Sequence, residues 1–346
     1  MDDKVNDDRR RFLGGAAVMI GMAGVGAGPA RGADHAAARP PATAAPPSPA
    51  GSPKRVRAGL LDVAFVEAGP TDGLPVILLH GWPYDIHSFD EVAPRLAAAG
   101  MRVIAPYLRG YGATRFLSDA TFRNGQPAAL ASDAIALMDA MHIERAVLAG
   151  FDWGARTADI VAALWPERVR GLVAVSGYLI GSQEAGKQPL PPEAELQWWY
   201  QFYFATERGR LGYERNRDAF ARLIWRLASP QWKFDDATFE RSAAAFDNPD
   251  HVAIVIHNYR WRLGLAEGED SYAAIEQRLA AAPAIPVPTI TLEGDANGAP
   301  HLPPPAYAAR FTGRYEHRTV VGGIGHNLPQ EAPDAFARAV IDVSKG

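Results

Sequence analysis

Short apolar runs alternate with helix-like segments along the chain from about residue 55 onward. These runs suit strands that are buried on both faces of a sheet, and they read PVILL, RVIAP, RAVLAG, GLVAVS, VPTITLE and HRTVV. The segments between them, such as SFDEVAPRLAAAG and ARTADIVAALWPERV, are helix-like, and RVRAGLLDVAFVEAG alternates enough for a leading hairpin. Strand and helix in alternation predict an α/β fold with a mostly parallel sheet covered by helices.

The alternation stops near residue 181 and resumes at VPTITLEGD. Residues 181–285 are helix-like, aromatic and charged, as in ELQWWYQFYFATERGRLGYERNRDAF. We therefore expect one α/β core, formed by residues 55–180 and 286–346, with residues 181–285 inserted into it as a helical cap.

The first residues have a different composition. Residues 1–33 contain the adjacent Arg9 and Arg10, then an apolar stretch rich in glycine and alanine, and this order resembles a twin-arginine export signal. A disordered N-terminus and a membrane anchor are the alternatives, but glycine dilutes the apolar stretch below what a membrane span needs. Residues 34–54 are Ala/Pro-rich and predict a flexible linker. We expect export to the periplasm and no membrane attachment of the mature form.

Composition and charge exclude several classes of function. The chain of 346 residues has a net charge of −4 and no long Lys/Arg run, so nothing in it favours nucleic acid as a partner. Without cysteine it has neither a disulfide nor a thiolate nucleophile, and its nine histidines lack a metal-ligand spacing. We therefore expect no metal and no cofactor.

The run GFDWG, from Gly150 to Gly154, follows a strand-like run and precedes a helix-like one. This frame is typical of a nucleophile elbow, in which small flanking residues let strand and helix approach and the central residue is presented at a tight turn. Asp152 occupies the nucleophile position. The alternative is that Asp152 only caps the following helix, which is the commoner role of aspartate there.

Two later residues complete the chain order nucleophile, acid, histidine that such an elbow requires. Asp295 lies just beyond the strand-like TITLEG, and His326 lies in a loop after the last strand-like run. Each alone is commonly a turn or surface residue. Glu293 is a rival acid, but in an extended strand it points to the opposite face from its neighbours.

These residues resemble the epoxide hydrolases of the α/β-hydrolase fold, over roughly residues 56 to 342. The motifs that carry the resemblance are HGWP at residues 80–83, RGYG at 109–112, GFDWGA, EGD ending at Asp295 and GHNLPQE around His326. Within the cap, WYQFYF and NYRWR match the segments that supply two tyrosines in this family, which here are Tyr200 and Tyr259. Tyr203 is the alternative to the first, and cap packing is the structural alternative for both. One departure is Phe151, which stands where the family often has histidine.

The resemblance implies a two-step hydrolysis of a small-molecule epoxide by water. Asp152 attacks a ring carbon and forms an ester, while Tyr200 and Tyr259 donate to the ring oxygen. His326, oriented by Asp295, then activates the water that hydrolyses the ester.

The HGWP motif and the residue after Asp152 are expected to build the oxyanion hole. The backbone N–H groups of Trp82 and Trp153 would stabilise the oxyanion. His80, Gly81 and Pro83 shape the turn that aims the Trp82 N–H, and the X-Pro bond in this turn is of the kind that can be cis.

Two other functions stay open at this stage. A haloalkane dehalogenase shares the aspartate, acid and histidine, and Trp153 could donate its indole N–H to a halide. That family often has an asparagine after HG, where this chain has Trp82, and the paired tyrosines favour an epoxide oxygen. A non-catalytic ligand-binding protein on the same scaffold is the other alternative, for which a broken triad is the expected sign. The sequence does not specify the substrate or the oligomeric state.

Overall fold

The computed structural model describes residues 53–346, so the predicted export signal and most of the predicted linker lie outside the described residues. The described part forms a mixed sheet in the order β1-β2-β4-β3-β6-β7-β8-β9, with β5 pairing with β2. The strands are β1 Lys54–Ala58, β2 Leu61–Ala68, β3 Leu74–Leu79, β4 Met101–Pro106, β5 Arg115–Phe116, β6 Ala146–Gly150, β7 Val169–Val175, β8 Thr289–Gly294 and β9 Tyr315–Val320.

Every antiparallel pair in the sheet includes β2. This strand forms the predicted leading hairpin with β1, and it also pairs with β4 and β5. From β4 to β9 every neighbouring pair is parallel, with registers such as Leu79 beside Gly150 and Gly150 beside Ala174. The central strand β6 is buried along its whole length, as its continuous apolar run predicts, and β8 beside the edge strand β9 is buried throughout as well. The prediction of an α/β fold with a mostly parallel sheet is therefore confirmed.

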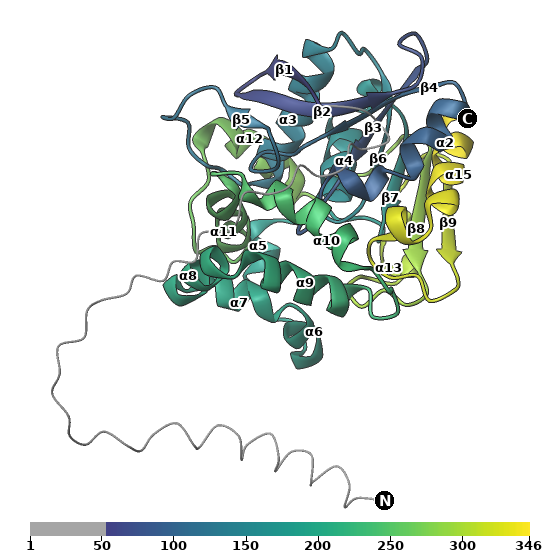
Figure 1. Cartoon of the computed structure of the whole chain (residues 1–346). Coiled ribbons are helices and arrows are strands. Elements are labelled where there is room, and N and C mark those ends of the chain that lie inside the picture. The colour runs from purple at the N-terminus through teal and green to yellow at the C-terminus, as the bar shows by residue number, and fades with distance from the viewer. Residues whose placement is uncertain (1–52) are drawn as a thin grey trace, which may run out of the picture. The chain divides into compact units, whose positions relative to one another are not determined.

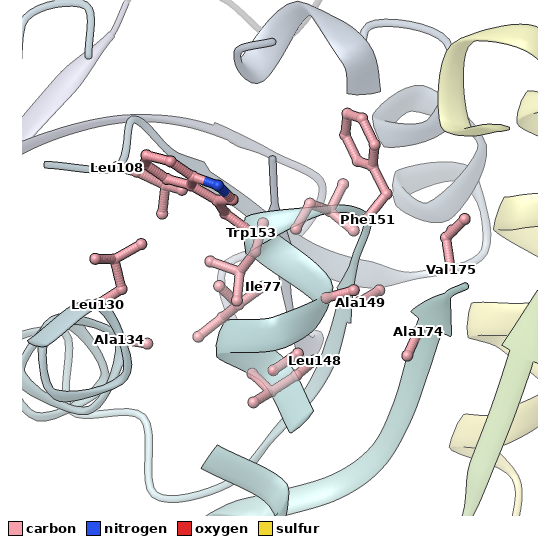
Figure 2. Packing of buried hydrophobic residues seen from close by; sticks show 14 of the residues in the cluster. Ile77, Leu108, Leu130, Ala134, Leu148, Ala149, Phe151, Trp153, Ala174 and Val175 are labelled. Carbon is pink, nitrogen blue, oxygen red and sulfur yellow. The ribbon is translucent and has the colours of Figure 1, made fainter. Parts of the chain in front are cut away.

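Helices pack on the sheet in two groups. α3 (Pro127–Ala140) packs against α4 (Trp153–Leu164), and α4 lies on β3, β6 and β7. α15 (Pro333–Ser344) packs against α2 (Val92–Ala98), and both lie beside the sheet at the right of Figure 1. Apolar side chains from α3, α4, β3, β6 and β7 meet in the core shown in Figure 2. Within residues 53–346, no helix is long and apolar enough to cross a membrane.

A run of helices lies between β7 and β8 in the chain, where the sequence predicts the cap. These helices are α5 Gln183–Gly186, α6 Pro192–Gln197, α7 Trp199–Ala205, α8 Glu207–Arg215, α9 Arg217–Ala228, α10 Asp236–Ala243, α11 His251–Arg262 and α12 Ala273–Ala280. α7 packs on α8 and α11, and Figure 1 shows this group together below the sheet. The described residues 53–346 form one compact unit by their contacts, so the exact boundaries of the cap stay a prediction.

The carboxyl ends of the parallel strands carry the predicted site residues. The HGWP turn follows β3, GFDWG follows β6, Asp295 follows β8, and the loop with His326 follows β9. Because parallel strands end at the same edge of a sheet, these segments meet there although they are far apart in the sequence. Two short helices follow these segments: α13 (Pro304–Tyr307) lies between β8 and β9, and α14 (Leu328–Glu331) comes directly after the loop with His326.

Candidate active site

Asp152 lies on a tight turn between β6 and α4, with φ 53° and ψ −127°. A Cβ atom at Gly150 or Gly154 would collide with the backbone that each approaches, so both positions need glycine. The Asp152 side chain makes no capping hydrogen bond to α4, which argues against a role as a helix cap only. Phe151 and Trp153 lie on opposite sides of this turn (Figure 2). The strained turn therefore presents Asp152 and separates its two aromatic neighbours.

The carboxylate of Asp152 is held by groups from two other strand ends. The Trp82 backbone N–H donates to Oδ1 at 2.7 Å, and His326 Nε2 lies 3.5 Å from Oδ2. Gly81 is needed here, because a Cβ on it would collide with the Asp152 carboxylate. Burial favours the neutral acid, but His326 and the N–H groups of Trp82 and Trp153 outweigh it and hold the pKa of Asp152 below its usual value. Asp152 is therefore an ionised carboxylate at neutral pH.

The turn that carries Trp82 is fixed from within. The Trp82–Pro83 peptide bond is cis, as the sequence allows. His80 is fully buried, and its Nε2 accepts the backbone N–H of Leu108 at 3.1 Å, so that its Nδ1–H faces the Gly81 carbonyl at 3.0 Å. Burial lowers the pKa of His80 to about 4 and keeps the ring neutral. His80 thus shapes the turn and does not face Asp152 as a base.

A buried chain of hydrogen bonds, unforeseen from the sequence, holds the Trp82 ring. Its indole N–H donates to the Tyr213 hydroxyl at 2.8 Å, and that hydroxyl lies 2.8 Å from His251 Nε2. His251 Nδ1 lies 2.9 Å from the Gly110 carbonyl, which can only accept a hydrogen bond. The donors are therefore, in order, the Trp82 indole N–H, the Tyr213 hydroxyl and the His251 Nδ1–H. Tyr213 and His251 belong to the predicted cap, so no motif near HGWP signals them.

Tyr200 and Tyr259 face each other across α7 and α11. Their ring centroids are 5.4 Å apart, and each ring lies 5.2 Å from the Trp82 ring. Burial and the Asp152 charge raise the pKa of both phenols, so both keep their protons. Tyr203 instead stacks on Phe220 within the helices, which favours Tyr200 as the first of the pair.

A cavity lies beside Asp152. Asp152, Tyr200 and His326 all line it, together with Trp82 and an apolar wall. The rest of the lining is Gln197, Ile224, Leu227, Ala228, Gly298, Ala299 and Pro300. The structure therefore brings the predicted nucleophile, one predicted proton donor and the predicted base to one cavity.

His326 is anchored through its main chain. Its N–H donates to the Ser229 hydroxyl at 3.0 Å, and this hydroxyl donates to Glu331 Oε1 at 2.6 Å. Glu331 Oε2 accepts the N–H of Gly325 at 2.8 Å, so one half-buried carboxyl holds the loop from two sides. The His326 side chain turns toward Asp152, and its Nδ1 is buried without a hydrogen-bond partner.

The predicted pairing of Asp295 with His326 is absent from this structure. Both Asp295 oxygens accept backbone N–H groups, from Gly322 at 3.0 Å and from Gly323 and Ile324 at 2.9 Å. These bonds, that of Gly322 foremost, lower the pKa of Asp295. The carboxylate turns to the loop because three aligned N–H groups satisfy it better than one ring nitrogen could. Asp295 therefore anchors the loop that leads to His326.

The rival acid Glu293 does not contact His326 either. It is buried, and its Oε1 accepts the Asn297 amide at 2.7 Å. Asn297 in turn reaches the Ser176 hydroxyl at the end of β7. Neither acid weighed from the sequence thus orients His326 directly in the described structure.

We expect Asp295→Asn to slow the His326-dependent step by about tenfold, because one charge-assisted hydrogen bond to the loop is lost. Removing the charge of an acid that directly orients a catalytic histidine costs about 10⁴-fold. Single-turnover rates of the variant and the parent measure the difference. A loss near 10⁴-fold would show that Asp295 leaves the loop and reaches His326 during turnover.

No group of three or more His, Cys, Asp or Glu side chains in the described range could hold a metal ion. The polar groups at the cavity suit acid, base and nucleophile chemistry on a small molecule. Phe151, the departure from the family pattern, is fully buried against Tyr84 and lies 6.2 Å from the His326 ring. It forms part of the wall behind His326 and makes no polar contact with Asp152.

Comparison with known proteins places this geometry in a family. Residues 75–219 match the family described as alpha/beta hydrolase fold. A candidate epoxide hydrolase from Klebsiella pneumoniae subsp. pneumoniae MGH 78578, of known crystal structure, is 65% identical, with a TM-score of 0.84 over 85% of this chain and 97% of that chain.

Two curated relatives match over shorter segments. Epoxide hydrolase B of Mycobacterium tuberculosis is 34% identical over 147 residues, which cover 39% of this chain and 40% of that protein. A haloalkane dehalogenase of Mesorhizobium japonicum is 36% identical over 130 residues, covering 35% of this chain and 38% of that protein. The matched segments thus span less than half of these curated relatives. The near-complete match to the Klebsiella protein, together with the matching family model, shows that the chain belongs to the epoxide hydrolase family of the α/β-hydrolase fold.

Proposed function

We propose that this protein is an epoxide hydrolase that opens a small-molecule epoxide to a vicinal diol with water as the only co-substrate. The observation that carries the proposal is that Tyr200, whose ring packs against Tyr259, lines the same cavity as the ionised carboxylate Asp152. A carboxylate and neighbouring phenol donors at one site suit a ring that is attacked at carbon and released at oxygen.

In the first proposed step, one Asp152 oxygen attacks a ring carbon and the carbon–oxygen bond of the epoxide breaks. The electron pair of that bond passes to the ring oxygen, which takes a proton from Tyr200 or Tyr259. The product is an ester between Asp152 and the opened substrate. A serine in this position would form an ether without a carbonyl for water to attack, which explains an aspartate at the elbow.

In the second step, His326 takes a proton from water and the resulting hydroxide attacks the carbonyl carbon of the Asp152 ester. The Trp82 N–H already lies 2.7 Å from Asp152 Oδ1, where the oxyanion would form. Such a donor contributes about 3 kcal/mol in comparable sites. Collapse of the intermediate releases the diol and restores the carboxylate, and the proton held by His326 passes through solvent to the phenolate left by the first step, which restores the tyrosine. Asp295 supports this step by holding the loop before His326.

A haloalkane dehalogenase is disfavoured by the state of the indole groups. A leaving halide needs N–H donors, but the Trp82 indole donates to Tyr213 and the Trp153 side chain is hydrogen-bonded to Tyr259. Using either for halide would leave a buried partner unsatisfied, at a cost of about 1 to 3 kcal/mol. A panel of epoxides and haloalkanes assayed for diol and for halide tests the proposal. Halide release without diol formation would contradict it.

A non-catalytic ligand-binding protein is the weaker alternative. His326 Nε2 lies 3.5 Å from Asp152 Oδ2, close enough for the histidine to act at this carboxylate. The strained backbone at Asp152, with a positive φ, is typical of a functional position. Turnover of any epoxide by the purified protein would exclude this alternative. Export by residues 1–33 stays a separate proposal from the sequence.

We expect Tyr200→Phe and Tyr259→Phe each to slow alkylation of Asp152 by about 10- to 100-fold, because each removes one donor to the developing alkoxide. The double variant should be slower by about 10³-fold or more. Rapid-quench measurement of ester formation isolates this step. Tyr203→Phe is the matched control, since its ring packs within the helices, and it should retain the parent rate. Normal alkylation in the double variant would assign both tyrosines to packing alone.

A further inference from the structure

Two arginines lie one helical turn from predicted catalytic residues. Arg156 follows Asp152 by four positions at the start of α4, and Arg262 follows Tyr259 by three positions on α11. Residues at these spacings share one face of a helix. Asn258 of α11 accepts a hydrogen bond from Arg156 Nη2 at 2.7 Å and so links the two helices at this point.

Neither guanidinium has a carboxylate partner. Arg156 lies over the Trp153 ring at 5.6 Å, and its Nε is buried without an acceptor. The Arg262 guanidinium lies over the Trp198 ring at 3.5 Å, and no hydrogen bond or ion pair joins this guanidinium to a residue between 53 and 346. The buried Arg109, by contrast, is paired with Asp133.

Further unused N–H donors lie beside these two arginines, on Trp198 under Arg262 and on Asn258 bonded to Arg156. Besides Arg156 Nε, the Trp198 indole N–H and the Asn258 amide are buried without acceptors. Trp198 lies in the chain between Gln197 and Tyr200, which both line the cavity. Buried donors without acceptors cost stability, so a ligand that supplies oxygen acceptors would gain the most there.

The charge around these donors is positive, which also favours a ligand with oxygen acceptors. Burial and the neighbouring Arg156 lower the pKa of Arg262 to about 10, which leaves it charged at neutral pH. Asp152 is the acid with the largest effect on Arg156. Glu276 also acts on Arg156, but burial raises the pKa of Glu276 to about 7, so it is only partly ionised. An anionic ligand would thus contact two positive guanidinium groups, and Asp152 is the main negative charge near them.

We propose that the substrate is an epoxide that carries a carboxylate, and that Arg262 and Arg156 bind this carboxylate. The proposal rests on the proposed function and adds the substrate class to it. An anionic substrate is repelled by the ionised Asp152 that must attack it, and two guanidinium groups offset this repulsion. Arginine suits the role because its planar fork matches a carboxylate.

The test compares a short series of ω-epoxy carboxylates with the corresponding primary amides, which match them in shape but lack the charge. The wild-type protein should prefer the best carboxylate over its amide by about 10- to 100-fold in kcat/KM. R262Q should bring this ratio close to one, mainly through KM of the carboxylate, and R262K should keep part of it. R156Q should lower the ratio in the same direction. Added salt should weaken the preference in the wild type.

Arg226 provides the matched control. It is exposed on α9 and R226Q removes the same charge, so the ratio should stay at the wild-type value. A wild-type ratio of one or less would overturn the proposal. A ratio that R262Q leaves unchanged would also overturn the proposal. This outcome includes an equal loss of rate for both substrates, which would show that the arginine acts only on the tyrosines. Thermal unfolding checks that each variant is folded.

A binding experiment separates this proposal from the proposed function. Phenylacetate and phenylacetamide contain no epoxide, and titration calorimetry measures their binding to the wild-type protein and to R262Q. Preference for phenylacetate that R262Q abolishes supports the carboxylate site even if no epoxide is hydrolysed. Equal binding of the two compounds, with neutral epoxides turned over normally, refutes the carboxylate site and leaves the epoxide hydrolase proposal intact.

Discussion

Asp152→Ala should lower epoxide turnover by at least about 10⁴-fold while the protein stays folded, since covalent nucleophiles contribute on this scale. Without the carboxylate, neither the Trp82 N–H nor His326 has a reacting group to act upon. The smaller side chain also relieves the close approach to Gly81, so no new collision opposes folding. Diol formation and thermal unfolding, measured on the same preparation, test both parts of this prediction.

Asp72→Ala is a matched control for this variant. Asp72 is exposed in the turn between β2 and β3, far along the chain from the elbow, and its loss should leave turnover unchanged. If folded Asp152→Ala protein still forms diol at more than a small fraction of the parent rate, Asp152 is not the nucleophile and another group must attack the ring.

His326→Gln should allow alkylation of Asp152 but slow hydrolysis of the ester by about 10³-fold or more, because the base for water is lost. The covalent intermediate should then accumulate and be visible by intact-protein mass spectrometry. An opened epoxide loses no atom, so the added mass should equal the whole substrate. Displacement of a halide would add only the alkyl portion.

The site of the adduct is the sharper part of this prediction. Proteolysis should place the added mass on the peptide that contains Gly150 to Gly154, and the double variant Asp152→Ala/His326→Gln should carry no adduct. An adduct on another peptide would refute the elbow mechanism. An adduct that lacks a halogen after incubation with haloalkanes would instead favour the dehalogenase alternative.

Much of the fold follows from local patterns in the sequence. Uniformly apolar runs such as the one that forms β6 predict strands buried on both faces, and they occupy the centre of the sheet. Gly150 and Gly154 predict the elbow because only residues without a Cβ fit that approach, and the structure shows the approach. These features depend on short stretches of chain and on steric limits that act within them.

The partners of single side chains could not be read in this way. Asp295 has the right position in the chain to orient His326, yet it binds the N–H groups of the Gly322–Ile324 loop. The direction of a carboxylate depends on which donors the rest of the fold brings within reach, and here three backbone donors compete with one ring nitrogen. The sequence contains no signal for that competition.

The sequence by itself determined the order of strands and helices, the position of the elbow and the identities of Asp152 and His326 as candidates, because periodicity and steric limits act locally. Only the tertiary structure decided that Tyr200 faces Tyr259, that Tyr213 and His251 hold Trp82, and that Arg262 lies near Asp152 without an acid. These contacts join the inserted helices to the ends of β3 and β6. They depend on how distant segments pack, and packing is a property of the whole chain that no single motif encodes.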